Sequence, residues 1–167
     1  MKRITQILIA VMLAFTALHS HAAALTDYGE NKLIDAVLRG QTLGVPATWY
    51  IGLATDTCTD SGSGTEPATG AYARVAVTAS LANWAGTQAA ASTTASSGTG
   101  GTTSNNGVIT FPTSTASWGT LQSVRWYDAA SAGNSWICIN LASSLIVTGA
   151  GFTPSFPAAT LQFQIDN

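Results

Sequence analysis

The chain carries little charge, because Lys, Arg, Asp and Glu together make up only 8% of its 167 residues. Both histidines, His19 and His21, lie within the first 24 residues, so residues 25–167 contain no imidazole base. That absence excludes histidine-based catalytic triads and histidine-containing zinc sites from most of the chain. The small number of Lys and Arg residues also argues against nucleic acid as a partner, because phosphate binding needs clustered cations.

The acidic residues do not indicate catalysis either. Glycoside hydrolysis needs two carboxylates on opposite sides of a sugar bond, whereas Glu66 lies in a loop and Asp128 in a distant hairpin. Asp56, Asp60 and Glu66 share a Gly/Ser-rich loop, but their spacing matches no defined calcium loop, so solvated acids are favoured over a calcium site. We expect no enzymatic activity, no cofactor and no bound metal.

The first residues are typical of a secretory signal. Lys2 and Arg3 precede an apolar run at 7–18, and small residues follow at 22–24. Residues 1–23 are therefore predicted to be a signal peptide, with a retained anchor or interfacial helix as the alternative. The apolar run is short for a membrane span, and we expect no stable span after cleavage. The remaining chain would have four cations and eight acidic residues, a net charge of −4.

Residues 24–167 have the length of one domain. Their short apolar runs between turn residues are typical of an all-β fold, and we expect a single β-sandwich of jelly-roll or Greek-key type. One short α-helix is predicted at about 27–39, because Asp27 and Glu30 have capping-box spacing and Gly40 ends the repeat. Its apolar stripe must pack on its own sheet or on a neighbouring subunit. That stripe comprises Leu33, Ile34, Val37 and Leu38.

A hairpin at 118–141 is predicted to form the centre of the domain. It contains Trp118, Trp126 and Trp136, and large aromatics supply much of the buried area of a small core. Small residues at 129–134 form its turn. Further strands are predicted at 48–55, 71–78, 108–112, 145–147 and 161–167.

Two long loops separate these strands. Residues 56–70 contain Gly, Ser, Pro and Asp throughout. Residues 85–106 form a low-complexity segment without a large apolar side chain, for which we expect a long flexible loop. Such a loop serves either recognition or spacing.

Cys58 and Cys138 are the only cysteines. In an exported chain, one cysteine in a loop and one in a core strand can form a disulfide across the sandwich. The alternative is an exposed free thiol at Cys58 and a buried one at Cys138. The tryptophans leave another alternative open, since exposed ones would stack on a cell-surface glycan while buried ones would form the core.

Several short motifs occur in a fixed order along the chain. They are LTDYGENKLID at 25–35, ATWYIGL at 47–53, GTE at 64–66, YAR at 72–74, ITFP at 109–112, WGT at 118–120, YDA at 127–129 and GN at 133–134. In this order and spacing the chain resembles a family of tailed-phage structural proteins commonly labelled tail fibre proteins. The resemblance covers residues 25–148.

The resemblance implies a non-enzymatic virion component that forms homo-oligomers or docks on other virion or surface proteins. It supplies no catalytic residue. It implies that Glu66 and Arg74 pair across a loop and that Asp128 and Asn134 fix the hairpin turn. The full set of implied structural anchors is Glu66, Tyr72, Arg74, Trp118, Asp128 and Asn134.

The signal segment departs from that family, because virion proteins normally assemble in the cytoplasm. Two locations therefore stay open, the virion or the periplasm and extracellular surface. In the second case the same domain would be an exported cell-surface, filament or carbohydrate-binding protein. Cys58 and Cys138 favour export, since disulfides persist in oxidising compartments.

Overall fold

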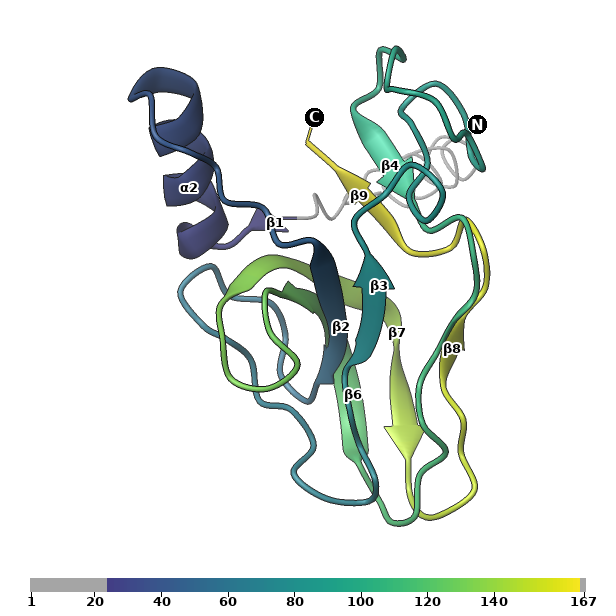
Figure 1. Ribbon diagram of the computed structural model, residues 1–167. Coiled ribbons are helices and arrows are strands. Elements are labelled where there is room, and N and C mark those ends of the chain that lie inside the picture. The colour runs from purple at the N-terminus through teal and green to yellow at the C-terminus, as the bar shows by residue number, and fades with distance from the viewer. Residues whose placement is uncertain (1–23, 166–167) are drawn as a thin grey trace, which may run out of the picture.

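The computed structural model describes residues 24–165 (Figure 1), and the predicted signal segment at 1–23 lies outside them. The described residues form one helix and nine strands, and all strand pairs are antiparallel. The expected all-β class with one short N-terminal helix is confirmed. The elements are β1 (Ala24–Leu25), α2 (Asp27–Leu38), β2 (Thr48–Ala54), β3 (Val75–Thr78), β4 (Thr102–Ser104), β5 (Ile109–Thr110), β6 (Gly119–Tyr127), β7 (Ser135–Val147), β8 (Ser155–Phe156) and β9 (Gln162–Gln164).

Five strands form the main sheet, in the order β1-β7-β6-β2-β3. Its centre is the predicted tryptophan hairpin, in which β6 pairs with β7 and Trp126 lies opposite Ile137. Strand β2 pairs with the other edge of β6 and places Ile51 opposite Trp126. The aromatic hairpin thus lies between β2 and β1 in the interior of the sheet.

Strand β7 is longer than the sequence indicated, because it continues to Val147 and includes the predicted separate strand at 145–147. The pairing changes from Asn140 opposite Ser123 to Leu145 opposite Leu121. Residues 141–144 therefore form a bulge between two paired stretches, and bulges bend a strand and increase its twist.

One face of the main sheet carries the hydrophobic core. Successive side chains of a strand point to opposite faces, so Ile51 and Leu53 of β2 share this face with Val124 and Trp126 of β6. All four are at most 2% exposed. Trp126 thus lies in the core, as the hairpin prediction requires.

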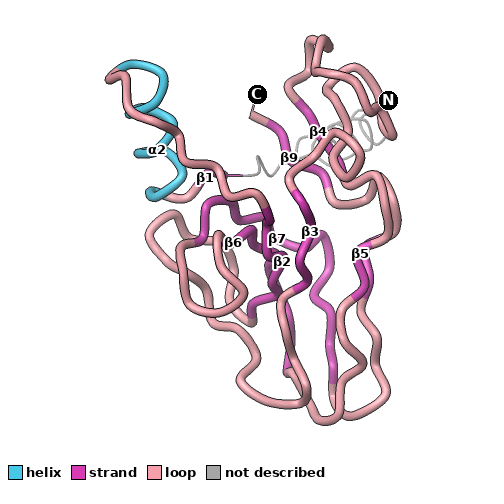
Figure 2. The backbone as a smooth tube through the Cα atoms, in the orientation of Figure 1, coloured by secondary structure: helices cyan, strands magenta, loops and turns pink. Residues whose placement is uncertain are grey.

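Beside the main sheet lie two short ribbons, β5–β8 and β4–β9. Their segments contribute Ile109, Phe111 and Leu161 to the core. Figure 2 shows that loops make up most of these segments. Segments rich in Gly, Ser, Thr and Pro support only short strands, so the second layer of the sandwich consists of two ribbons instead of a full sheet.

Helix α2 begins one residue after its cap. The N-cap is Thr26, whose hydroxyl accepts the Gly29 N–H at 3.3 Å, so the predicted capping role of Asp27 is wrong. Asp27 is the first helical residue instead, where its negative charge complements the helix dipole. The helix ends at Leu38, one residue earlier than predicted, and Gly40 follows with a φ of 68°.

Two strand predictions and one loop prediction differ from the structure. The strand predicted at 71–78 begins only at Val75, where its pairing with Ile51 of β2 starts, and Ala71 is not extended because its φ is 61°. The segment at 85–106 ends in β4, which pairs with β9 at its β-branched threonines. The flexibility of this segment stays a prediction. At the C-terminal strand, Leu161 is buried as expected, whereas Ile165 is 70% exposed.

Candidate functional site

The second face of the main sheet is covered by residues 55–74, the cover loop, which connects β2 to β3. Gly52, Arg125 and Cys138 lie next to one another on this face, in three neighbouring strands. The loop attaches to this face through its own backbone, because the Gly62 carbonyl accepts a hydrogen bond from Arg125 at 2.6 Å and the Ser63 carbonyl accepts one from Tyr127. Hydrogen bonds therefore hold the cover loop on the sheet.

The Glu66 carboxylate is the centre of a polar cluster in the cover loop. It accepts hydrogen bonds from Arg74 Nη2 at 2.6 Å and from the Tyr72 hydroxyl at 2.6 Å. The Arg74 side chain is only 6% exposed, and it also donates to the Ala129 carbonyl in the hairpin turn at 2.6 Å. Its guanidinium lies 3.4 Å from the centre of the Tyr127 ring. The cluster thus joins the loop to the hairpin.

Burial and the nearby carboxylate affect the two tyrosines of this cluster. Desolvation, followed by the hydrogen bond to Glu66, raises the pKa of Tyr72 above its ordinary value. Desolvation, followed by the charge of Glu66, raises the pKa of Tyr127 to about 12. Gly52 makes room for this packing, since a Cβ there would lie 2.6 Å from Glu66 Oε1. Both phenols are therefore neutral hydrogen-bond donors at neutral pH.

Asp128 closes the hairpin turn. Its carboxylate accepts the Asn134 backbone N–H at 2.7 Å, the Asn134 side-chain amide at 2.9 Å and the Trp136 indole N–H at 3.3 Å. Partial burial opposes ionisation, but these hydrogen bonds prevail and lower the pKa of Asp128 below its ordinary value. The turn is therefore fixed by charge-assisted hydrogen bonds.

A disulfide joins Cys58 of the cover loop to Cys138 of β7, with a Cα–Cα distance of 5.7 Å. The predicted pairing of Cys58 with Cys138 is confirmed, and the alternative of two free thiols is wrong. The bond does not cross the sandwich as expected, because it joins β7 to the cover loop on the face away from the core. Cys58 is fixed further because its N–H donates to the Asn140 side chain at 2.8 Å.

Trp118 links the start of β6 to the far end of the cover loop. Its indole N–H donates to the Gly70 carbonyl at 2.8 Å, and its ring meets the Tyr72 ring edge-on at 5.2 Å. The structure thus brings Trp118 into contact with the Glu66 cluster through Tyr72. Asp128 and Asn134 form a separate group at the hairpin turn.

The sequence did not indicate the buried polar residues, of which Arg125, Asn105 and Ser114 make contacts between distant segments. Arg125 is 0% exposed beneath the cover loop. Its position as a single cation between apolar residues of a predicted core strand could have indicated that it is buried. Asn105 binds the C-terminal segment through the Leu161 N–H and the Pro157 carbonyl. The Ser114 hydroxyl donates to the Gly149 carbonyl and accepts the Phe152 N–H. No local pattern distinguishes this Asn or this Ser from many others in the chain.

Two of the three loop acids considered for calcium bind within the domain, and the third, Asp60, is exposed. Asp56 accepts the Thr65 N–H at 2.9 Å, and Glu66 is paired with Arg74. Within residues 24–165, no three His, Cys, Asp or Glu side chains lie close enough together to hold a metal ion. In the same range, no helix has the length and hydrophobicity needed to cross a membrane.

Helix α2 exposes most of its apolar stripe. Ile34, Val37 and Leu38 are 50%, 68% and 78% exposed. The helix packs on the sheet through its opposite side, where Tyr28 contacts the Trp136 ring at 5.2 Å and a Cβ at Gly29 would lie 2.5 Å from the Trp136 carbonyl oxygen. Packing of the whole stripe on the sheet of the same chain, one of the two expectations, is therefore wrong.

Hydrogen bonds, an ion pair and a disulfide thus hold the domain together, and α2 exposes its apolar side chains. Sequence comparison identifies the family to which the chain belongs. The family model described as Podophage GP4 fiber I protein gp80 matches residues 24–164. The chain belongs to this phage fibre family. No curated protein shows significant sequence similarity to the chain. The motif series at 25–134 lies within the matched residues, so the resemblance to tail fibre proteins is confirmed.

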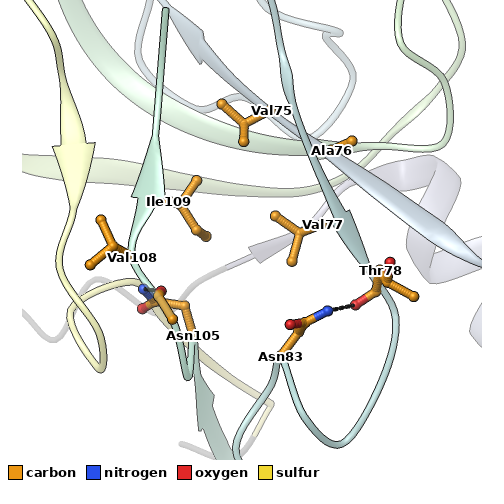
Figure 3. A pocket seen from close by; sticks show the side chains of 9 residues that line it. Val75, Ala76, Val77, Thr78, Asn83, Asn105, Val108 and Ile109 are labelled. Carbon is orange, nitrogen blue, oxygen red and sulfur yellow. Dashed lines mark hydrogen bonds between the residues drawn. The ribbon is translucent and has the colours of Figure 1, made fainter.

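The fibre-family domain also contains a hollow of about 230 Å³ between β3 and β5. Figure 3 shows the side chains of Val77 and Ile109 pointing into it from the two strands. Asn83 closes one end by donating to the Thr78 carbonyl at 3.0 Å. Its lining consists of apolar and uncharged polar residues.

Proposed function

We propose that this member of the fibre family is a non-enzymatic structural protein that self-associates and attaches the virion to a surface. The observation that carries this proposal is the exposed stripe of α2, with Ile34, Val37 and Leu38 together on one side of the helix. Contiguous exposed apolar side chains mark interaction sites in soluble proteins. A helix of 12 residues also gains most of its stability from packing.

The polar residues support a structural role. Glu66, Arg74 and Asp128 bind each other or the backbone of their own domain. Arg125 is buried under the cover loop and donates to loop carbonyls. Groups engaged in this way hold a rigid scaffold, on which exposed surfaces carry the contacts.

Immunogold labelling of intact virions tests this function. An antibody against the chain is expected to label the fibres of the particle. A particle that contains every other structural protein but shows neither label nor a mass-spectrometric trace of the chain would contradict the proposal.

The exported cell-surface or filament protein is the second candidate, and the Cys58–Cys138 disulfide favours it. N-terminal sequencing of the chain from fractionated host cells separates the two candidates. Export predicts a mature start near residue 24 in the periplasm or medium, whereas a chain that keeps Met1 in the cytoplasm contradicts export.

Attachment to a cell-surface glycan belongs to the same proposal. Among the tryptophans, Trp118, Trp126 and Trp136 are buried, while Trp49 and Trp84 are half-buried. A sugar platform would therefore rest on one of these last two. Binding to a glycan array and changes in tryptophan fluorescence on addition of sugars test this attachment. If neither measurement shows binding, glycan attachment is excluded from the proposal.

A further inference from the structure

The chain carries a second exposed apolar surface, the β9 cleft, at the β4–β9 ribbon. This cleft has a volume of about 540 Å³ and is lined by Leu81, Trp84, Phe163 and Ile165 among mostly small residues. Leu81 is 53% exposed and Ile165 is 70% exposed. One domain therefore exposes both an apolar helix ridge and an apolar cleft.

We propose that the α2 stripe of one copy binds in the β9 cleft of a second copy. This inference rests on the self-association proposed above and names its two surfaces. Ile34, Val37 and Leu38 have the i, i+3, i+4 spacing with which amphipathic helices enter apolar grooves. A cleft of this volume is within the range of pockets that bury a compact apolar group.

The charges of the two surfaces agree with this contact. Neither the three stripe residues nor any residue lining the β9 cleft is charged. Their contact therefore requires no charged side chain of the interface to leave water unpaired, which would oppose binding. Glu30 lies one turn before Ile34 on the same side of α2, and Asp35 pairs with Arg39 at 2.9 Å. These charged side chains border the stripe, so they stay in water at the edge of the contact.

The two surfaces cannot meet within one copy. Figure 1 shows α2 and the β4–β9 ribbon at the same end of the molecule, with α2 at the upper left and the ribbon apart from it at the upper right. The helix is held there at its first turn, because the Thr26 N–H donates to the Trp136 carbonyl at 3.0 Å and Tyr28 packs on the Trp136 ring. A second copy is therefore needed to satisfy both surfaces.

A helix-to-cleft contact joins two different surfaces and has two possible arrangements. Two copies that exchange helices reciprocally form a twofold dimer, whereas a one-way contact repeats from copy to copy into a closed ring or an open filament. Every copy then uses both its helix and its cleft. A contact between two α2 helices would instead leave the cleft unused.

Two full-length variants separate these arrangements. Val37→Asp places a charge in the stripe, and Leu81→Asp places one in the cleft. Val108→Asp is the matched control, because Val108 is 63% exposed and belongs to neither surface. All three positions are exposed, so unchanged circular dichroism and melting temperature are expected. Light scattering coupled to size-exclusion chromatography then measures the mass of each sample.

We expect wild type and Val108→Asp to assemble alike, and Val37→Asp and Leu81→Asp each to associate at least tenfold more weakly. An equimolar mixture of Val37→Asp and Leu81→Asp retains one intact helix and one intact cleft, so it should form heterodimers and nothing larger. Assembly of Leu81→Asp at wild-type strength, or a mixture that stays monomeric, would overturn the inference while self-association stands. A monomeric wild type would contradict self-association itself.

Discussion

The two faces of the main sheet are held to their covering layers by different interactions. On the core face, Ile51 and Trp126 pack against the two ribbons through apolar contacts. On the other face, Arg125 and Tyr127 donate to carbonyls of the cover loop, and a disulfide ties that loop to β7. The same strands supply both faces, because alternate residues of β6 point in opposite directions.

This difference determines what each layer responds to. Apolar packing depends on buried area and shape, so the core face should respond to changes in side-chain volume. Hydrogen bonds, ion pairs and a disulfide depend on particular atoms and on protonation and oxidation. The cover loop should therefore respond to reductant and pH, to which the core face is indifferent.

The largest effect is expected from Trp126→Ala in the core. The side chain is 2% exposed, and removing a buried large aromatic costs about 4 kcal/mol of unfolding free energy. Urea denaturation followed by circular dichroism measures this loss. Trp49→Ala is the matched control, because Trp49 is only half-buried and should cost less. Equal losses for the two variants would show that burial does not rank the tryptophans.

The next effect tests the cover loop through its disulfide. The bond links cysteines 80 residues apart. Chain entropy predicts that closing a loop of this size stabilises the fold by about 4.5 kcal/mol, and measured disulfides often contribute less. A double variant, Cys58→Ala with Cys138→Ala, should therefore be about 3 kcal/mol less stable than the oxidised wild type. Dithiothreitol should weaken the wild type and leave the double variant unchanged. A wild type that is equally stable with and without reductant would contradict a role for this bond in holding the loop.

The core face was largely predictable from the sequence. The alternation of Trp49, Ile51 and Leu53 indicated a strand, and the tryptophan hairpin was placed within a few residues, because side-chain period is a local property. The bulge at 141–144 was not predictable, since it depends on how β7 pairs with β6. Strand β4 of one ribbon was not predicted, because it lies in a segment without large apolar residues.

The cover loop was less predictable than the core. A loop at 56–70 follows from composition, but its carbonyl contacts with Arg125 and Tyr127 join residues more than 60 positions apart. The pairing of Glu66 with Arg74 came from the family resemblance and not from periodicity. The exposure of α2 could not be read from its stripe either, since an amphipathic pattern does not say whether the partner lies in the same chain.

Alkaline pH should weaken the cover-loop face by a smaller amount. The pKa of Tyr127 is raised from 10.0 to about 12 in the folded chain. The unfolded state loses its proton first, so the stability due to Tyr127 is complete below pH 10 and is lost as the pH rises to about 12. The loss is about 2 kcal/mol on the scale of 1.36 kcal/mol per pH unit.

Urea denaturation of wild type and Tyr127→Phe at pH 9 and pH 12 isolates this contribution. The phenylalanine variant should lose less stability between the two pH values, and Tyr72 affects both proteins alike because it is present in both. Identical losses would mean that Tyr127 ionises as freely in the folded chain as in the unfolded one.

The smallest effect is expected at the rim of the polar face, where Asp128 is partly exposed. The hydrogen bonds from Asn134 and Trp136 keep its pKa below the ordinary value, so its contribution is present above about pH 4 and declines as the pH falls through the lowered pKa. Because solvent screens this carboxylate, Asp128→Asn should cost less than about 1 kcal/mol at pH 7. The acid-side slope of stability against pH, measured from pH 5 to pH 2, should be shallower in the variant. A loss at pH 7 as large as that of the disulfide variant would show that the turn, and not the cover loop, dominates the polar face.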